Sequence, residues 1–150
     1  MKRHLIIRFI LAILLSTSAF ANYGKADDYI GKPGDLANVF RTIKITAIEY
    51  MFLPAEINVT QGETIKFVVE NKGNKKHEMV IDTKENLKNH AKMRRLDPDA
   101  GQIGPNQIIL GLGEQKTLIW EFTRTGTINF ACPLPGHFKG MRGIINVETK

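Results

Sequence analysis

Four side chains in this sequence could together bind one transition-metal ion. Cys132, His137 and Met141 lie near the C-terminus in the pattern C-x4-H-x3-M, and His77 lies far upstream. Two imidazoles, one thiolate and one weakly bound thioether are the ligands of a blue-copper electron-transfer site. Thiolate and thioether suit Cu(I), and imidazole suits both oxidation states. The sequence therefore predicts one copper ion per chain that changes between Cu(II) and Cu(I).

The spacing explains how one loop could supply three of these ligands. Cys132 ends a segment of alternating apolar residues, and residues 133–136 turn the chain so that His137 returns to the same point. Met141 lies near the start of the last expected strand. His77 must come from a neighbouring strand, so the fold has to hold the ligands together. A rigid site needs little reorganisation when it gains or loses an electron.

Other chemistry remains open for the same residues. Zinc can bind two histidines and a cysteine, but methionine is a poor zinc ligand. Cys132 and His137 could form the nucleophile pair of a cysteine-dependent hydrolase, but the sequence offers no obvious orienting group or oxyanion site. As the single cysteine, Cys132 cannot form an internal disulfide, and it could also be an inert core residue. The complete ligand set favours copper, and we expect that the protein is not an enzyme.

Residues 1–21 have the features of a secretory signal peptide. Lys2, Arg3 and Arg8 give a positive start, residues 9–15 are apolar, and residues 19–21 form an A-x-A cleavage site. The apolar run is shorter than the ~20 residues that a membrane-spanning helix needs. We therefore expect export to the periplasm of a Gram-negative host, with no membrane span after cleavage, rather than a membrane anchor.

Charge and length bound the possible partners. The formal net charge of +6 falls to +3 once Lys2, Arg3 and Arg8 are removed with the signal segment. Nucleic-acid-binding domains carry a strongly basic stripe, so we expect no nucleic-acid partner. The residues after position 21 suffice for one domain with a real core, which we expect to be a monomer.

Short β-strands are the elements expected to position the ligands. From Arg41 onward, apolar and polar residues alternate with a period of two. His77, Met79 and Ile81 would share the apolar face of one such strand. About seven short strands separated by turns predict an antiparallel sandwich over residues 41–150. Residues 22–40 show no periodicity and are expected to form a flexible arm.

Residues 83–96 break this alternation and predict a helix. Asp82 or Thr83 could cap its start, and Pro98 would stop it. We expect Leu87 and Ala91 to cover the sandwich.

His90 and Met93 on this helix are a further candidate. Residues three apart share a helix face, so the two side chains could hold a second Cu(I) ion. A surface histidine beside a packing methionine is the simpler interpretation.

The metal-binding pattern and the strands before it resemble the cupredoxins. The C-x4-H-x3-M loop has the azurin spacing, and two segments resemble small periplasmic plastocyanin/azurin-like proteins, some of them linked to copper tolerance: KHEMVIDTKENLKNHAKM and FACPLPGHFKGM. The resemblance covers about residues 41–149. It implies an all-β Greek-key sandwich of seven to eight strands with one type 1 copper site at His77, Cys132, His137 and Met141.

Three features depart from better-known members of that family. Azurins carry a disulfide, which a chain with one cysteine cannot form. Glu78 stands where an asparagine often follows the first histidine, and Lys76 stands where azurins offer a glycine carbonyl. Because outer residues orient metal ligands, a distorted, greener copper site is expected.

Two functions share this site. As a one-electron carrier, the protein would dock a cytochrome or copper oxidoreductase near His137, expected as the exposed ligand edge within an apolar rim of Leu134, Pro135 and Phe138. Lys139 and Arg142 would favour an acidic partner. Alternatively, the resemblance implies a copper-tolerance protein that binds or oxidises excess periplasmic copper.

Overall fold

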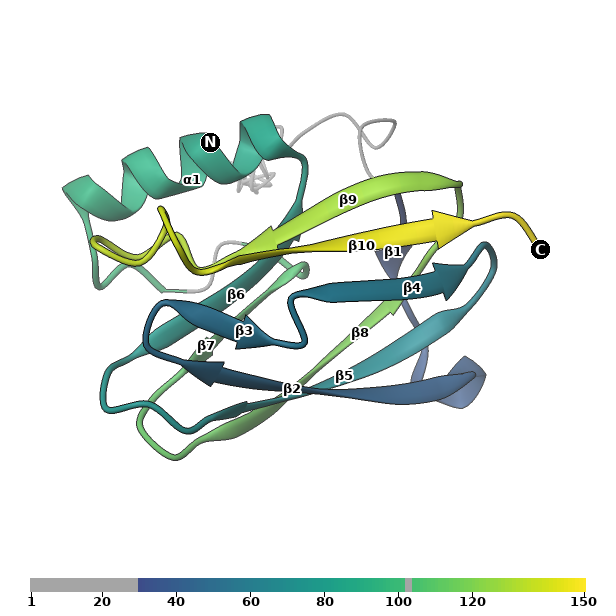
Figure 1. Cartoon of the computed structure of the whole chain (residues 1–150), viewed down its shortest axis with the longest axis horizontal. Helices are drawn as coiled ribbons and strands as arrows, with labels where there is room; N and C mark the ends of the chain where they lie inside the picture. Colours follow the sequence, from purple (N-terminus) through teal and green to yellow (C-terminus); the bar gives the residue numbers. More distant parts are fainter. Residues whose placement is uncertain (1–29, 102–103) are drawn as a thin grey trace, which may run out of the picture.

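The computed structural model of this chain describes residues 30–101 and 104–150, which fold into two packed β-sheets with one α-helix against them (Figure 1). The strands are β1 (Lys32–Pro33), β2 (Arg41–Ile48), β3 (Met51–Leu53), β4 (Glu56–Thr60), β5 (Thr64–Asn71), β6 (His77–Asp82), β7 (Gln107–Leu110), β8 (Gln115–Glu121), β9 (Gly126–Ala131) and β10 (Arg142–Glu148). The helices are α1 (Lys84–Leu96) and the short 3-10 helix η2 (Leu36–Asn38). The predicted all-β sandwich with one inserted helix is confirmed.

The strand order brings the two halves of the metal-binding pattern together. One sheet has the order β1-β8-β5-β2-β3, and the other has the order β4-β10-β9-β6-β7. The pairs β2–β5 and β4–β10 are parallel, and the other pairs are antiparallel. Strands β6 and β9 run antiparallel with Ile81 opposite Phe130. The start of β6, which carries His77, therefore lies beside the end of β9, which leads into Cys132.

Strand β6 is buried on both faces. Met79 and Ile81 belong to the main core between the sheets, whereas Val80 packs with Leu87 of α1 and with Ala131. Helix α1 covers the outer face of this part of the sheet (Figure 1). This arrangement explains why Glu78, which would face solvent on an uncovered sheet, is fully buried.

Helix α1 begins and ends where the sequence predicts. The Thr83 side chain accepts a hydrogen bond from the backbone N–H of Asn86, and the helix ends at Leu96, two residues before Pro98. Leu87 and Ala91 are buried, as expected.

The interpretation of His90 and Met93 as a second copper site is wrong. The buried stripe of α1 consists of Leu87, His90, Ala91 and Arg94, which follows the i, i+3, i+4, i+7 spacing of one helix face. His90 is 2% exposed, whereas Met93 lies outside the stripe and is 43% exposed. The simpler interpretation, a surface histidine beside a packing methionine, is also wrong, because the histidine is the buried residue and the methionine the exposed one.

The domain begins earlier than residue 41. Residues 30–40 of the expected arm lie on the sandwich, because Lys32 and Pro33 pair with Glu121 and Trp120 of β8. The short strands β1, β3 and β7 raise the number above the expected seven or eight. The predicted signal peptide and its cleavage site lie outside the described residues. Among the residues that are described, no helix is long and apolar enough to cross a membrane.

Replacing Phe130 tests whether this part of the core stabilises the fold. Its side chain is fully buried two residues before Cys132, and its ring centroid lies 5.4 Å from that of Phe52. We expect Phe130→Ala to lower the free energy of unfolding by about 3–5 kcal/mol, because it leaves a cavity, as measured by chemical denaturation. The control, Phe40→Ala, changes a ring that is 71% exposed; an equal loss in both variants would contradict this assignment of the core.

Candidate metal centre

Three of the four predicted ligands meet at one end of the sandwich. His77 is the first residue of β6, Cys132 follows β9 directly, and His137 lies in the loop before β10. The Nδ1 atoms of the two histidines are 3.2 Å apart, and Cys132 Sγ lies 3.5 Å from His137 Nδ1. One ligand atom from each residue lies within 4.8 Å of the others, and all three residues are buried. The structure thus joins a residue from β6 to a loop more than fifty residues later.

Backbone hydrogen bonds fold the ligand loop back on itself. The N–H of Cys132 donates to the carbonyl of Met141 (3.0 Å), and the N–H of Met141 donates to the carbonyl of His137 (2.9 Å). Gly136 has a φ of +82°, a conformation that glycine adopts without strain. Met141 is fully buried. These bonds therefore hold the backbone of Cys132, His137 and Met141 close together.

The donor set fits a copper ion. Bonds from transition metals to imidazole nitrogen and thiolate sulfur are about 2.0–2.3 Å long, so donors 3.2 and 3.5 Å apart can all contact one ion. Thiolate and imidazole together are ligands that copper prefers.

Burial sets the protonation state of all three residues in the metal-free protein. It raises the pKa of the Cys132 thiol to about 11, although the N–H groups of Glu78 and Leu134 lower it in part. Burial also lowers the pKa of His77 and of His137 from the ordinary value of 6.5. Near pH 7 the histidines are therefore neutral and ready to bind, whereas the thiol must release a proton to a competing metal.

Glu49 lies behind His77, in the turn between β2 and β3. Its Oε1 atom is 3.6 Å from His77 Nε2 and accepts a hydrogen bond from the N–H of Asn74 at 2.6 Å. A Cβ atom on Gly73 would lie 2.3 Å from that oxygen and 2.8 Å from His77 Nε2. Only glycine therefore leaves room for this approach. A carboxylate behind a histidine ligand orients its ring, here with Nδ1 toward the cluster.

His137 is the least buried of the four predicted ligands, since the other three are 0% exposed, but it does not form the exposed edge that the sequence predicted. His137 is 6% exposed, because the Tyr50 ring packs against it edge to face, with centroids 5.4 Å apart. Tyr50 itself is 49% exposed and has a φ of +68°. Lys75 Nζ lies 3.3 Å from the Tyr50 hydroxyl. The surface above the site is therefore formed by Tyr50.

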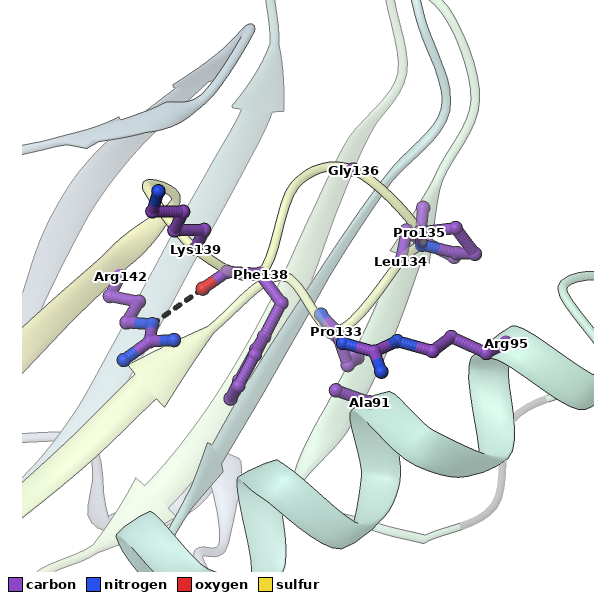
Figure 2. A pocket seen from close by; sticks show the side chains of 9 residues that line it. All are labelled: Ala91, Arg95, Pro133, Leu134, Pro135, Gly136, Phe138, Lys139 and Arg142. Atoms are coloured by element: carbon purple, nitrogen blue, oxygen red, sulfur yellow. Dashed lines mark hydrogen bonds between the residues drawn. The ribbon is translucent and has the colours of Figure 1, made fainter.

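A groove of about 530 Å³ separates the ligand loop from α1 (Figure 2). Leu134 and Phe138 give it apolar walls, and its cationic side chains are those of Arg95, Lys139 and Arg142. The Arg142 guanidinium lies 4.2 Å from the Phe138 ring centroid, and Arg142 Nε donates to the Phe138 carbonyl. The groove thus combines apolar surface with positive charge beside the metal-binding loop.

Sequence reasoning missed Glu49, Tyr50 and the burial of Glu78. The turn that carries Glu49 and Tyr50 shows no local signal of its position, because only the folded sandwich brings it over the histidines. The burial of Glu78 could have been predicted, since the helix expected directly after its strand could cover the polar face of that strand.

Comparisons with known proteins agree with this geometry. A family model described as copper binding proteins of the plastocyanin/azurin family matches residues 38–148. A "Copper-resistant cuproprotein CopI" from Rubrivivax gelatinosus is 40% identical over 135 residues, which cover 89% of this chain and 82% of that protein. A protein of the same name from Pseudomonas aeruginosa is 30% identical and covers 93% of both chains.

Solved structures share the fold. Auracyanin B superposes with a TM-score of 0.65 at 19% identity, covering 78% of this chain and 95% of its own. A reduced auracyanin from Roseiflexus castenholzii gives a TM-score of 0.61 at 23% identity, with coverage of 71% and 95%. At these identities the likeness shows the fold alone.

Titration with Cu(II) tests the ligand assignment. One equivalent should produce a strong thiolate-to-copper absorption band and a type 1 EPR signal in the wild type. Cys132→Ser should lose both, because the band needs the thiolate sulfur. Met93→Leu, which changes an exposed methionine, should leave both unchanged. A band that survives in Cys132→Ser would contradict the assignment.

The metal-free protein should lose stability at both ends of the pH range. Because folding lowers the pKa of His77 and His137, the unfolded chain binds more protons as the pH falls through 6.5, and the melting temperature should drop between pH 7.5 and 5. Because folding raises the pKa of Cys132 from 9.0 to about 11, stability should also fall as the pH rises above 9.

Variants separate the two effects in thermal melts. His77→Gln with His137→Gln should flatten the acid side only, and Cys132→Ser should flatten the alkaline side only. Unchanged slopes in these variants would show that other groups cause the pH dependence.

Proposed function

This chain belongs to the plastocyanin/azurin family of copper-binding proteins, and we propose that it binds copper in the periplasm as part of copper resistance. The observation that carries this proposal is the buried cluster of His77, Cys132 and His137, in a chain 40% identical to a copper-resistant cuproprotein. The features of a signal peptide in residues 1–21 support the location.

His77, Cys132 and His137 would hold the ion, with Met141 as a fourth, weakly bound ligand. When bound, copper supplies a reversible one-electron couple between Cu(II) and Cu(I). Cys132 gives up its proton on binding, whereas the neutral histidines bind without losing one. Glu49 orients His77, and Tyr50 shields His137 from water.

The same residues argue against an enzyme with a cysteine nucleophile. A reactive thiol needs a lowered pKa and access to solvent, but Cys132 is fully buried and its pKa is raised. We therefore propose that the protein catalyses no hydrolysis.

A one-electron carrier is the second candidate. It is supported by Tyr50, whose half-exposed ring contacts the His137 ring and so links the cluster to the surface. The nearby groove, with Arg95, Lys139 and Arg142, suits a redox partner with an acidic surface. Under this function the copper site would exchange electrons with a cytochrome or copper oxidoreductase.

Deletion of the gene distinguishes the two functions. For copper resistance, we expect the deletion strain to grow at lower copper concentrations than the wild type, with respiration unchanged. Plasmid-borne wild-type protein and Met93→Leu should restore growth, whereas Cys132→Ser should not, because it lacks the thiolate. The mature chain should be recovered from the periplasm with Asn22 as its first residue.

Two results would overturn the proposal of copper resistance. Normal copper tolerance in the deletion strain, together with slower electron flow, would favour the carrier. Full rescue by Cys132→Ser would show that resistance does not use this site.

A further inference from the structure

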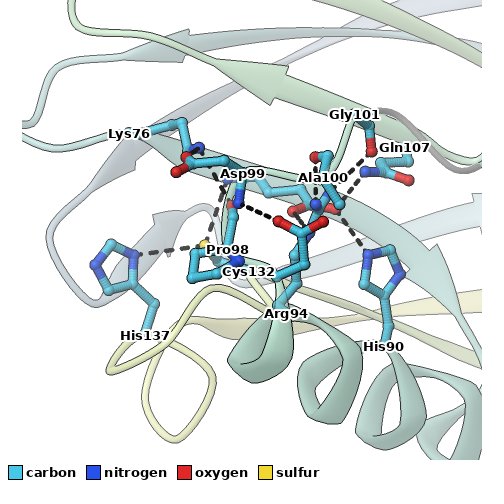
Figure 3. Close-up of polar contacts among 12 residues, drawn as sticks. Lys76, His90, Arg94, Pro98, Asp99, Ala100, Gly101, Gln107, Cys132 and His137 are labelled. Atoms are coloured by element: carbon cyan, nitrogen blue, oxygen red, sulfur yellow. Dashed lines mark hydrogen bonds and ion pairs between the residues drawn. The ribbon is translucent and has the colours of Figure 1, made fainter.

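Glu78 is the centre of a buried polar cluster beneath α1. Arg94 Nε donates to its Oε2 atom at 2.7 Å, Gln107 Nε2 donates to Oε1, and His90 Nε2 lies 3.0 Å from Oε1. All four residues are at most 2% exposed. Figure 3 shows His90, Arg94 and Gln107 close together, with Cys132 between this cluster and His137, which lies at the opposite side of the view.

Arg94 extends the cluster to the segment after α1. Its Nη1 donates to the Ala100 carbonyl, and its Nη2 donates to the Gly101 carbonyl at 3.3 Å. Lys76, the residue before His77, contacts the same segment. Its Nζ donates a hydrogen bond to Asp99 Oδ1 at 2.8 Å. Both sequence neighbours of His77 are therefore tied to residues 99–101, Lys76 directly and Glu78 through Arg94.

The backbone of Glu78 connects this cluster to the candidate metal ligand. Glu78 directly follows His77, and its N–H donates to Cys132 Sγ at 3.4 Å. The side chain and the N–H belong to one residue, so contacts that hold the buried carboxylate also restrict how far the backbone of Glu78, and with it the N–H, can move. Hydrogen bonds to the cysteine sulfur tune the potential of blue-copper sites.

Stability alone is a weak reason for such a cluster. A buried ion pair must offset the loss of hydration of both charges, and apolar residues of similar size are often as stabilising.

We propose that Glu78, with Arg94, His90 and Gln107, is a positioning cluster that aims the Glu78 N–H at the Cys132 sulfur. Helix α1 is then part of the outer shell of the metal centre and not only a cover for the sheet. The inference rests on the proposed copper binding and names the residues that tune it. A charged cluster takes the place that a single asparagine side chain often has in the family.

The test removes both charges at once. Glu78→Gln with Arg94→Met leaves no unpaired buried charge, so the variant should fold. In the full mature protein with one equivalent of copper, we expect a shifted thiolate-to-copper band, a changed reduction potential and about 10–100-fold weaker Cu(I) binding, the range seen for outer-shell changes. An unchanged band and potential would overturn the proposal.

Two variants of α1 act as controls. Arg95→Met removes the same charge from the next residue, which faces the groove, and should change none of these values. Leu87→Ala loosens the packing of α1 on Val80 and Ala131 and leaves in place the three side chains that contact the Glu78 carboxylate. If Leu87→Ala shifts the band as much as the double variant, the cluster only holds the helix in place and the proposal fails.

A measurement without metal separates this proposal from the proposed function. Hydrogen exchange of the Glu78 amide in the metal-free protein should be faster in the double variant than in the wild type or Arg95→Met. Equal exchange rates in all three proteins would overturn the positioning role even if copper binds. Failure of the wild type to bind copper would overturn the function and leave this exchange result to decide the positioning role by itself.

Discussion

Two imidazoles and a thiol have to be held in contact with one another in a dry part of the protein, and the rest of the structure serves that constraint. Strands β6 and β9 bring His77 beside Cys132, and backbone bonds within the loop return His137 and Met141 to the same place. Burial keeps the histidines neutral and the thiol protonated. The folded chain therefore presents a preformed set of donors that metal and protons compete to occupy.

Much of the site could be predicted from local patterns. The C-x4-H-x3-M spacing and the alternation in β6 suffice to bring three candidate ligands together, and the capping signal at Asp82 or Thr83 predicted where the helix begins, with Thr83 as the cap in the structure. The missed features depend on contacts between distant segments. Glu78 is buried only because α1 folds over β6, and Tyr50 covers His137 only because the β2–β3 turn reaches the loop. The alternation of apolar and polar residues along the sequence does not reveal contacts between distant segments.

Two neighbouring arginines on α1 lie in different environments, one in the interior and one at the surface. Arg94 is 1% exposed and binds Glu78 inside the protein, whereas Arg95 lines the groove at the surface. Successive residues of a helix point about 100° apart, so a change from interior to surface needs only one step. The helix thereby lies between the interior of the metal centre and the surface that a partner would meet.

The burial of Cys132 also protects the thiol of the metal-free protein from oxidation. Oxidation and thiol–disulfide exchange proceed through an accessible thiolate, and the Cys132 thiol is fully buried with a pKa of about 11. Two metal-free molecules therefore cannot cross-link through their single cysteines while they stay folded. In an oxidising compartment, the rate at which the metal-free protein would lose its thiol therefore depends on how often the sandwich opens.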